Sequence, residues 1–92
     1  MNENALIVEL KERGLEAESQ VPIKIVYKGN QVGDYFADIV VENKVILELK
    51  AVETLQKIHE AQLLNYLNAT GYKIGLLVNF TYPKAEIKRF IL

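Results

Sequence analysis

Three residues in the middle of the chain carry groups that could act together on a phosphate ester. Asp38, Glu48 and Lys50 stand in two extended segments joined by the loop Glu42-Asn43-Lys44. Residues two apart in a strand share a face, so Glu48 and Lys50 should point the same way. The three-residue loop allows the register in which Asp38 lies opposite Glu48, with Cβ atoms about 5 Å apart. Two such carboxylates suit Mg²⁺ with water completing its octahedron. Lys50 could then orient or deprotonate an attacking water and stabilise charge at phosphorus.

The same spacing is also typical of an amphipathic strand whose polar face is simply hydrated. Glu48 and Lys50, two apart on an exposed strand face, are a common pattern without any chemistry. A shared site makes a further prediction, because two acids without a metal repel each other. At least one of the two pKa values should then be raised, with Lys50 relieving part of the repulsion.

A helix predicted from about Leu55 to Ala69 favours the site. His59, Gln62 and Tyr66 fall within an arc of roughly 60° in the middle of its apolar side. That side is formed by Leu55, Ile58, Leu63, Leu67 and Ala69. A lone histidine there is usually a satisfied core residue, and a lone tyrosine usually serves packing. Three polar groups in line need partners when they are buried, so we expect this line to pack toward the carboxylates.

The N-terminal segment holds one further candidate acid. Residues 3–13 have the helical spacing, and Gly14 follows as a C-terminal stop. Glu9 projects toward the apolar side of this helix rather than toward solvent. It either takes part in the site or is a side chain that reaches water from the helix edge.

The elements that must position these residues follow from the periodicity of the sequence. Helices are predicted at 3–13 and 55–69, and strands at 15–27, 32–41, 45–50, 73–80 and 85–92, with breaks at Lys28-Gly29-Asn30 and Pro83. The order is helix, three-strand meander, helix, strand, strand. It predicts an α/β (α+β) fold in which helices pack on a single mixed sheet.

Composition bounds the class of protein. A chain of 92 residues, half of them apolar, supports one modest core and one domain over residues 1–92. The lack of cysteine excludes disulfide scaffolds, zinc ribbons and thiol nucleophiles. No apolar run approaches the roughly 20 residues of a membrane span, and no signal peptide is visible, so we expect a cytoplasmic protein without a membrane partner. The net charge of −1 argues against a free-standing nucleic-acid binder, but not against a local basic groove.

Two motifs resemble those of a known superfamily. Ala37-Asp38, nine residues, then Glu48-Leu49-Lys50 resembles the motif of the PD-(D/E)xK nucleases, and Gln62 with Tyr66 resembles the QxxxY motif of their RecB-like members. Nearly the whole chain is similar to the small GxxExxY protein family, notably in YKGNQVGDYFADIVVENKVILELKAVE and HEAQLLNYLNATG. The resemblance implies an αβββαβ restriction-endonuclease-like core and Mg²⁺-dependent hydrolysis of nucleic-acid phosphodiesters.

The resemblance also implies roles for individual residues. Asp38 and Glu48 would be ligands of Mg²⁺ (or Mn²⁺), and Lys50 the catalytic lysine. Gln62 and Tyr66 would support the site or contact nucleic acid, DNA in preference to RNA. His59, which lies in line with Gln62 and Tyr66, and Glu9 of the first predicted helix are further supporting candidates.

The chain departs from the family pattern in two places. Ala37 stands where the motif has proline, a residue that contacts no metal. The segment that names the family should lie upstream: Asn2 sits where its tyrosine would fall, and its glutamate would precede Met1. We therefore expect a domain that is short at its N-terminus and has lost that glutamate, unless Glu9 substitutes for it.

Three interpretations remain open on the sequence alone. The first is a Mg²⁺-dependent nuclease, which the carboxylate pair favours. The second is a catalytically weak or inactive nuclease-fold module that binds nucleic acid or a protein partner, which the charge and the missing segment favour. The third is a homodimer without chemistry, since residues 21–27 and 87–92 could form sheet edges open to pairing.

Overall fold

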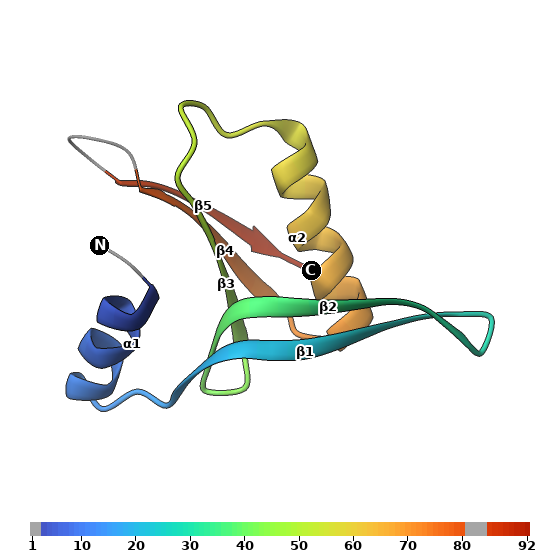
Figure 1. The fold of residues 1–92 in the computed structure, drawn as a ribbon, viewed down its shortest axis with the longest axis horizontal. Helices are drawn as coiled ribbons and strands as arrows, with labels where there is room; N and C mark the ends of the chain where they lie inside the picture. The colour runs from blue at the N-terminus through green and yellow to red at the C-terminus, as the bar shows by residue number, and fades with distance from the viewer. Residues whose placement is uncertain (1–2, 81–84) are drawn as a thin grey trace.

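The computed structural model describes residues 3–80 and 85–92, and Figure 1 shows their arrangement. Within them the chain forms, in order, α1 (Glu3–Glu12), β1 (Ala17–Tyr27), β2 (Asn30–Val41), β3 (Val45–Lys50), α2 (Lys57–Thr70), β4 (Ile74–Phe80) and β5 (Ala85–Ile91). The predicted order is confirmed, and each boundary lies within two residues of its predicted position. The predicted break at Pro83 lies outside the described residues.

All five strands belong to one mixed sheet with the order β1-β2-β3-β4-β5. Neighbouring strands are antiparallel except β3 and β4, which are parallel. Parallel neighbours need a crossover connection, and α2 provides it. The predicted α+β class with a single mixed sheet is therefore confirmed, and β1 and β5 are the edge strands.

Each face of the sheet carries a hydrophobic cluster and one helix (Figure 1). Ile46 of β3 belongs to the cluster that packs on α2, and its neighbour Leu47 belongs to the cluster that packs on α1. Because alternate residues of a strand face opposite sides, Glu48 and Lys50 share the face of Ile46. The predicted site residues on β3 therefore face α2.

The long β1–β2 hairpin is kinked at Gln20. This residue has a φ of 53°, in the left-handed region that non-glycine residues seldom adopt. The register between β1 and β2 is the same on either side of Gln20 and passes over the pair Gln20–Asp38; it shifts only further along the arm, between Ile25 and Val26. The Gln20 side chain donates to the Glu3 carboxylate at 3.1 and 3.2 Å, so α1 helps to hold the kink.

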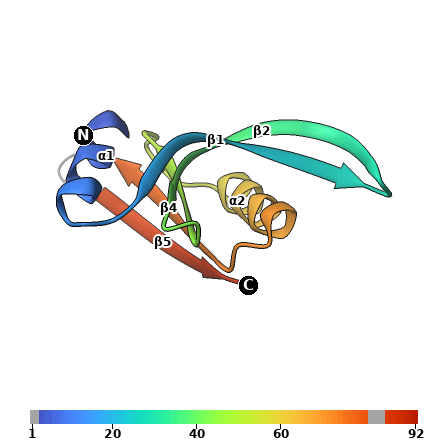
Figure 2. The same ribbon diagram turned by 90° about the horizontal axis from the view of Figure 1, so that it is seen from below.

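The kink changes which face of the sheet the hairpin presents. Ala17 belongs to the α1 cluster, whereas Ile23, also odd-numbered, belongs to the α2 cluster. A local irregularity that shifts the alternation by one residue has this effect on every following side chain. Residues 21–37, which we call the arm, continue beyond the part of β2 that pairs with β3 and extend past the sheet beside α2 (Figures 1 and 2).

Helix α2 has defined ends and a close contact with the sheet. At its start the Gln56 N–H donates to His59 Nδ1 at 3.0 Å. At its end Gly71 adopts a φ of 78° and donates to the Leu67 carbonyl at 2.9 Å, as a left-handed C-terminal cap does. On β4, a Cβ at Gly75 would lie 2.9 Å from Leu63 Cδ1, so the glycine lets α2 approach the strand.

The apolar side predicted for α2 is wrong in part. Ile58 is 71 % exposed and Ala69 is also exposed, while Tyr66 is buried. The helix begins at Lys57, and Leu55 enters the core from the preceding loop rather than from the helical face. The prediction counted Leu55 as a helical residue, and it therefore assigned the buried face of α2 to the wrong side chains.

A membrane-spanning helix is not found among residues 3–80 and 85–92, because neither helix there combines the necessary length and apolar character.

Candidate active site

Asp38 and Glu48 lie side by side and are joined through the backbone of each other's strand. The Asp38 N–H donates to Glu48 Oε1 at 3.3 Å, and the Leu49 N–H donates to Asp38 Oδ2 at 2.8 Å. The last β2–β3 pair on this side is Ile39–Leu47, so these two amides lie just beyond the strand ladder and the carboxylates accept them. The predicted three-residue loop and its register produce this arrangement.

Glu48 is the buried member of the pair, with 4 % of its surface exposed. Burial, and then the charge of Asp38, raise the pKa of Glu48 from an ordinary 4.5 to about 7. The Asp38 N–H and the Lys50 ammonium act in the opposite direction. A raised pKa was predicted from repulsion between the acids, but desolvation is the larger cause.

Two side chains of α2 reach this part of the sheet. Lys50 Nζ donates to Gln62 Oε1 at 3.5 Å, which links the end of β3 to the helix. Tyr66, four residues further along the same helix face, is 5 % exposed. Burial, followed by the charge of Glu48, raises the pKa of Tyr66, and a hydrogen bond with Gln62 opposes this shift. Gln62 and Tyr66 therefore lie beside the carboxylate pair, as the polar line predicted.

The structure does not bring His59 and Glu9 to the pair. His59 lies in the first turn of α2, where its side chain accepts the backbone N–H of the N-cap residue Gln56 as part of a capping box. Glu9 forms an ion pair with Arg13 at 3.0 Å on α1, across the sheet from α2. In the described part of the chain, no group of three or more His, Cys, Asp or Glu side chains could hold a metal, so Glu9 does not complete a triad of acids.

Asn79 is a residue of this region that sequence reasoning missed. It is 1 % exposed and pairs with Lys50 in the parallel β3–β4 register. Its Oδ1 accepts the Val52 N–H at 2.9 Å, and its Nδ2 donates to the Val52 carbonyl at 2.8 Å. Asn79 thereby fixes the chain two residues after Lys50. The available signal was an asparagine in the otherwise apolar run of β4.

The donor set fits one hard divalent cation. Each carboxylate engages a backbone amide through one oxygen, and each has a second oxygen with which to meet a metal. Magnesium is commonly held by one or two carboxylates and keeps several waters. The repulsion that helps to raise the Glu48 pKa would be relieved by a cation between the acids.

Fold and site together define a class: a restriction-endonuclease-like αβββαβ sheet with two acids and a lysine facing one helix. The family model of the PD-(D/E)XK nuclease superfamily matches residues 1–90, and the chain belongs to that superfamily. Members of this superfamily generally use divalent metals.

A crystal structure of SSO0001 has the same fold, with a TM-score of 0.73 and 22 % sequence identity. The match covers 97 % of this chain and 47 % of that one, so the chain spans about half the length of its structural relative. No curated protein matches the sequence significantly.

Proposed function

We propose that this chain is a nuclease domain in which Asp38 and Glu48 hold Mg²⁺ or Mn²⁺ for the hydrolysis of nucleic-acid phosphodiesters. The observation that carries this proposal is that each carboxylate accepts a backbone N–H from the strand of the other, with Lys50 on the same face of β3. A purely structural strand end has no need of two acids whose proximity raises a pKa.

Each residue of the site has a chemical role in this proposal. The cation, when bound, polarises the phosphate and lowers the pKa of bound water. Lys50, oriented by its hydrogen bond to Gln62, stabilises the negative charge that develops at phosphorus. The Gln62 amide and the Tyr66 hydroxyl are positioned to donate to the phosphate oxygens beside it. Glu48 must give up its proton before it can bind a cation, so metal uptake should strengthen as the pH rises through about 7.

Cleavage and metal binding test the proposal separately. Single- and double-stranded DNA and RNA are incubated with Mg²⁺, with Mn²⁺ and with EDTA, and calorimetry follows metal binding without substrate. We expect cleavage with either metal, faster for DNA than for RNA, and no cleavage in EDTA. Lys50→Ala should abolish cleavage and retain metal binding, whereas Asp38→Asn should abolish both. Cleavage that persists in Lys50→Ala would come from a contaminating nuclease and would count against the assignment.

A second candidate is a nuclease-fold module that binds nucleic acid or a protein partner without cutting. It is favoured by the small acid set, since no third acid of the described residues joins Asp38 and Glu48 in a metal-binding group, and by the net charge of −1. The edge strands β1 and β5 are open to pairing in a homodimer. Nucleic-acid binding without cleavage in both metals would support this candidate, and sedimentation would show whether the bound form is a dimer.

A further inference from the structure

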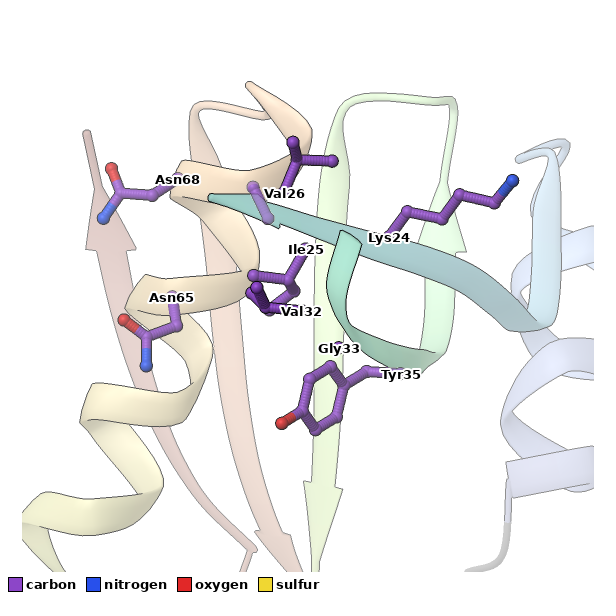
Figure 3. Close-up of a pocket in the computed structure, with 9 residues that line it drawn as sticks. Lys24, Ile25, Val26, Val32, Gly33, Tyr35, Asn65 and Asn68 are labelled. Atoms are coloured by element: carbon purple, nitrogen blue, oxygen red, sulfur yellow. The ribbon is translucent and has the colours of Figure 1, made fainter. Parts of the chain in front are cut away.

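A groove runs between the arm and α2, apart from the carboxylates (Figure 3). Its larger cavity, of about 550 Å³, is lined by Lys24, Ile25, Val26, Val32, Gly33, Tyr35, Asn65, Asn68 and Ala69. A smaller adjoining cavity of about 250 Å³ shares Ile25, Tyr35 and Asn65 with it. The larger volume lies in the range of small-molecule sites. The kink at Gln20 turns Ile25 and Tyr35 toward α2, and these two residues line both cavities.

Tyr35 provides a fixed aromatic surface in this groove. A Cβ at Gly33 would lie 2.6 Å from the Tyr35 ring, so the ring lies over a strand position that only glycine leaves open. On the helix side, the Tyr35 and Tyr66 rings are tilted with centroids 5.7 Å apart. The tyrosine nevertheless remains 43 % exposed. A ring held by its neighbours and still open to solvent is a preorganised stacking platform.

The opposite wall carries carboxamides and no charge. Asn65 and Asn68 stand three residues apart on α2 and are both exposed, and Figure 3 shows them on the helix that borders the groove. Lys24 lines the cavity, but its side chain extends away from the helix in this view. Among the described residues, no acid lines either cavity. The groove therefore suits a flat, neutral ligand with hydrogen-bonding edges better than a phosphate group.

The groove leads to the candidate active site. The smaller cavity is also lined by Gln62 and Tyr66. Gln62 accepts a hydrogen bond from Lys50, and Tyr66 experiences the charges of Glu48 and Asp38. A ligand that occupies the groove and continues past Tyr66 thus arrives at the carboxylate pair.

We infer that the groove seats an unpaired nucleobase, so that the substrate is single-stranded or locally unpaired nucleic acid. The inference rests on the proposed function for the position of the phosphodiester at Asp38 and Glu48. Aromatic rings stack on splayed bases, and asparagine carboxamides match the donor and acceptor edges of bases. A base inside a duplex is stacked and paired, and its faces cannot reach Tyr35.

The test uses a short single-stranded oligonucleotide that contains one 2-aminopurine, with Ca²⁺ in place of Mg²⁺ to bind the strand without cutting it. We expect quenching of the 2-aminopurine fluorescence when the base stacks on the protein. An oligonucleotide with abasic sites in place of its bases should bind at least about tenfold more weakly, because the loss of a single stacked base already has an effect of this size. A duplex of the same sequence should also bind more weakly than the single strand.

Two variants address the groove without touching the carboxylates. Asn65→Ala should weaken binding of the base-bearing strand and leave binding of the abasic strand unchanged. Asn4→Ala, at an exposed asparagine of α1, is its matched control and should change neither. Gly33→Ala should displace the Tyr35 ring and abolish the quenching, with the melting temperature recorded to show that the variant is folded.

The outcomes separate this inference from the nuclease proposal. Equal binding of the base-bearing and abasic strands overturns the groove assignment, as does the absence of quenching or of any binding. If Mg²⁺-dependent cleavage is observed in that case, the nuclease proposal stands alone. If binding depends on the base but no metal supports cleavage, the groove is a nucleobase site in a non-cutting module and the nuclease proposal fails.

Discussion

Glu48 places a carboxyl group where the alternation of β3 would otherwise place an apolar side chain. It follows Ile46 on the α2 face and is almost as buried, with 4 % of its surface exposed. Ionisation in that environment is costly, and the pKa of about 7 expresses the cost. The ionised form of Glu48 is therefore unfavourable in the folded protein, and under the nuclease proposal a cation between the two acids would stabilise it.

Replacing this acid should remove a pH dependence of stability. Because its pKa is raised in the folded state, the Glu48 contribution is fully present below about pH 4.5 and is lost as the pH rises through about 7. The loss is on the order of 3 kcal/mol at most. Urea unfolding in EDTA should show the wild type losing stability between about pH 5 and about pH 8, and Glu48→Gln losing less. Parallel pH profiles would show that Glu48 ionises as freely in the folded chain as in the unfolded one.

Asp38→Asn should relieve the pair without removing its backbone contact. The amide oxygen can still accept the Leu49 N–H that Asp38 Oδ2 now accepts, while the charge that raises the Glu48 pKa disappears. We expect the free energy of unfolding without metal to stay the same or rise slightly, and Mg²⁺ to stop raising the melting temperature. A large loss of stability in EDTA would instead identify Asp38 as a structural residue.

At the scale of elements, the site depends on how the chain leaves β3. Lys50 is the last residue of the strand, and α2 begins at Lys57. Between them the Asn79 side chain accepts the Val52 N–H and donates to the Val52 carbonyl. These two hydrogen bonds resemble those that a neighbouring strand would make. The start of α2, and with it Gln62, is thereby placed relative to Lys50.

Asn79→Ala should therefore disturb both stability and the site. The part-buried N–H and carbonyl of Val52 would lose their partners, and because they remain partly accessible to water the cost should lie at the low end of the roughly 1–3 kcal/mol of an unsatisfied buried group. We expect a lower melting temperature and a larger loss in kcat than in substrate affinity. Asn79→Asp keeps the acceptor for the Val52 N–H and lacks the donor, so it should recover only part of the loss. Full activity in a folded Asn79→Ala protein would show that the loop holds its course without this side chain.

The periodicity of the sequence predicted the elements and the carboxylate pair because both depend on local spacing. A three-residue loop determines the register of β2 and β3, and register alone brings Asp38 to Glu48. The kink at Gln20 has only a weak signal: Val21-Pro22 indicates an edge position or an irregular start of the strand, but it does not predict which face of the sheet the arm presents. Because the kink reverses the facing of the arm, the contact between Tyr35 and Tyr66 could not be predicted from strand alternation. The capping role of His59 was missed because it depends on where α2 begins.

At the scale of the whole molecule, the arm makes the chain elongated, with extents of 43, 31 and 20 Å. It has large exposed apolar side chains, namely Val26, Tyr27, Val32, Tyr35 and Phe36. The outer part of the arm pairs only β1 with β2, and β3 covers none of β2 before Ile39. The sheet centre is a compact core, and the arm is a two-stranded extension of it.

The rate of backbone hydrogen exchange should differ between the arm and the centre of the sheet. Backbone amides near the arm tip, around Tyr27 to Val32, should exchange much faster than those of β3 and β4, because local opening there exposes little buried surface. A single-stranded oligonucleotide bound in the groove should slow exchange at the arm residues around Tyr35. Equal protection of the tip and the core would mean that the arm is covered in solution, as in a homodimer.

The left-handed residue at Gln20 has a consequence for how such a domain can diversify. It separates two facings of one strand pairing: Ala17 before it packs on the α1 side of the sheet, and Ile23 after it packs on the α2 side, in an unchanged β1–β2 register. Loop tips tolerate changes of length, so residues can be added or removed at the tip around Gly29 without shifting the carboxylates. An insertion between Asp38 and the β2–β3 loop would instead change the register that brings Asp38 to Glu48. The tip of the hairpin can therefore vary independently of the carboxylate pair, and grafting a different tip should change what the arm binds while Asp38 and Glu48 keep their relative positions.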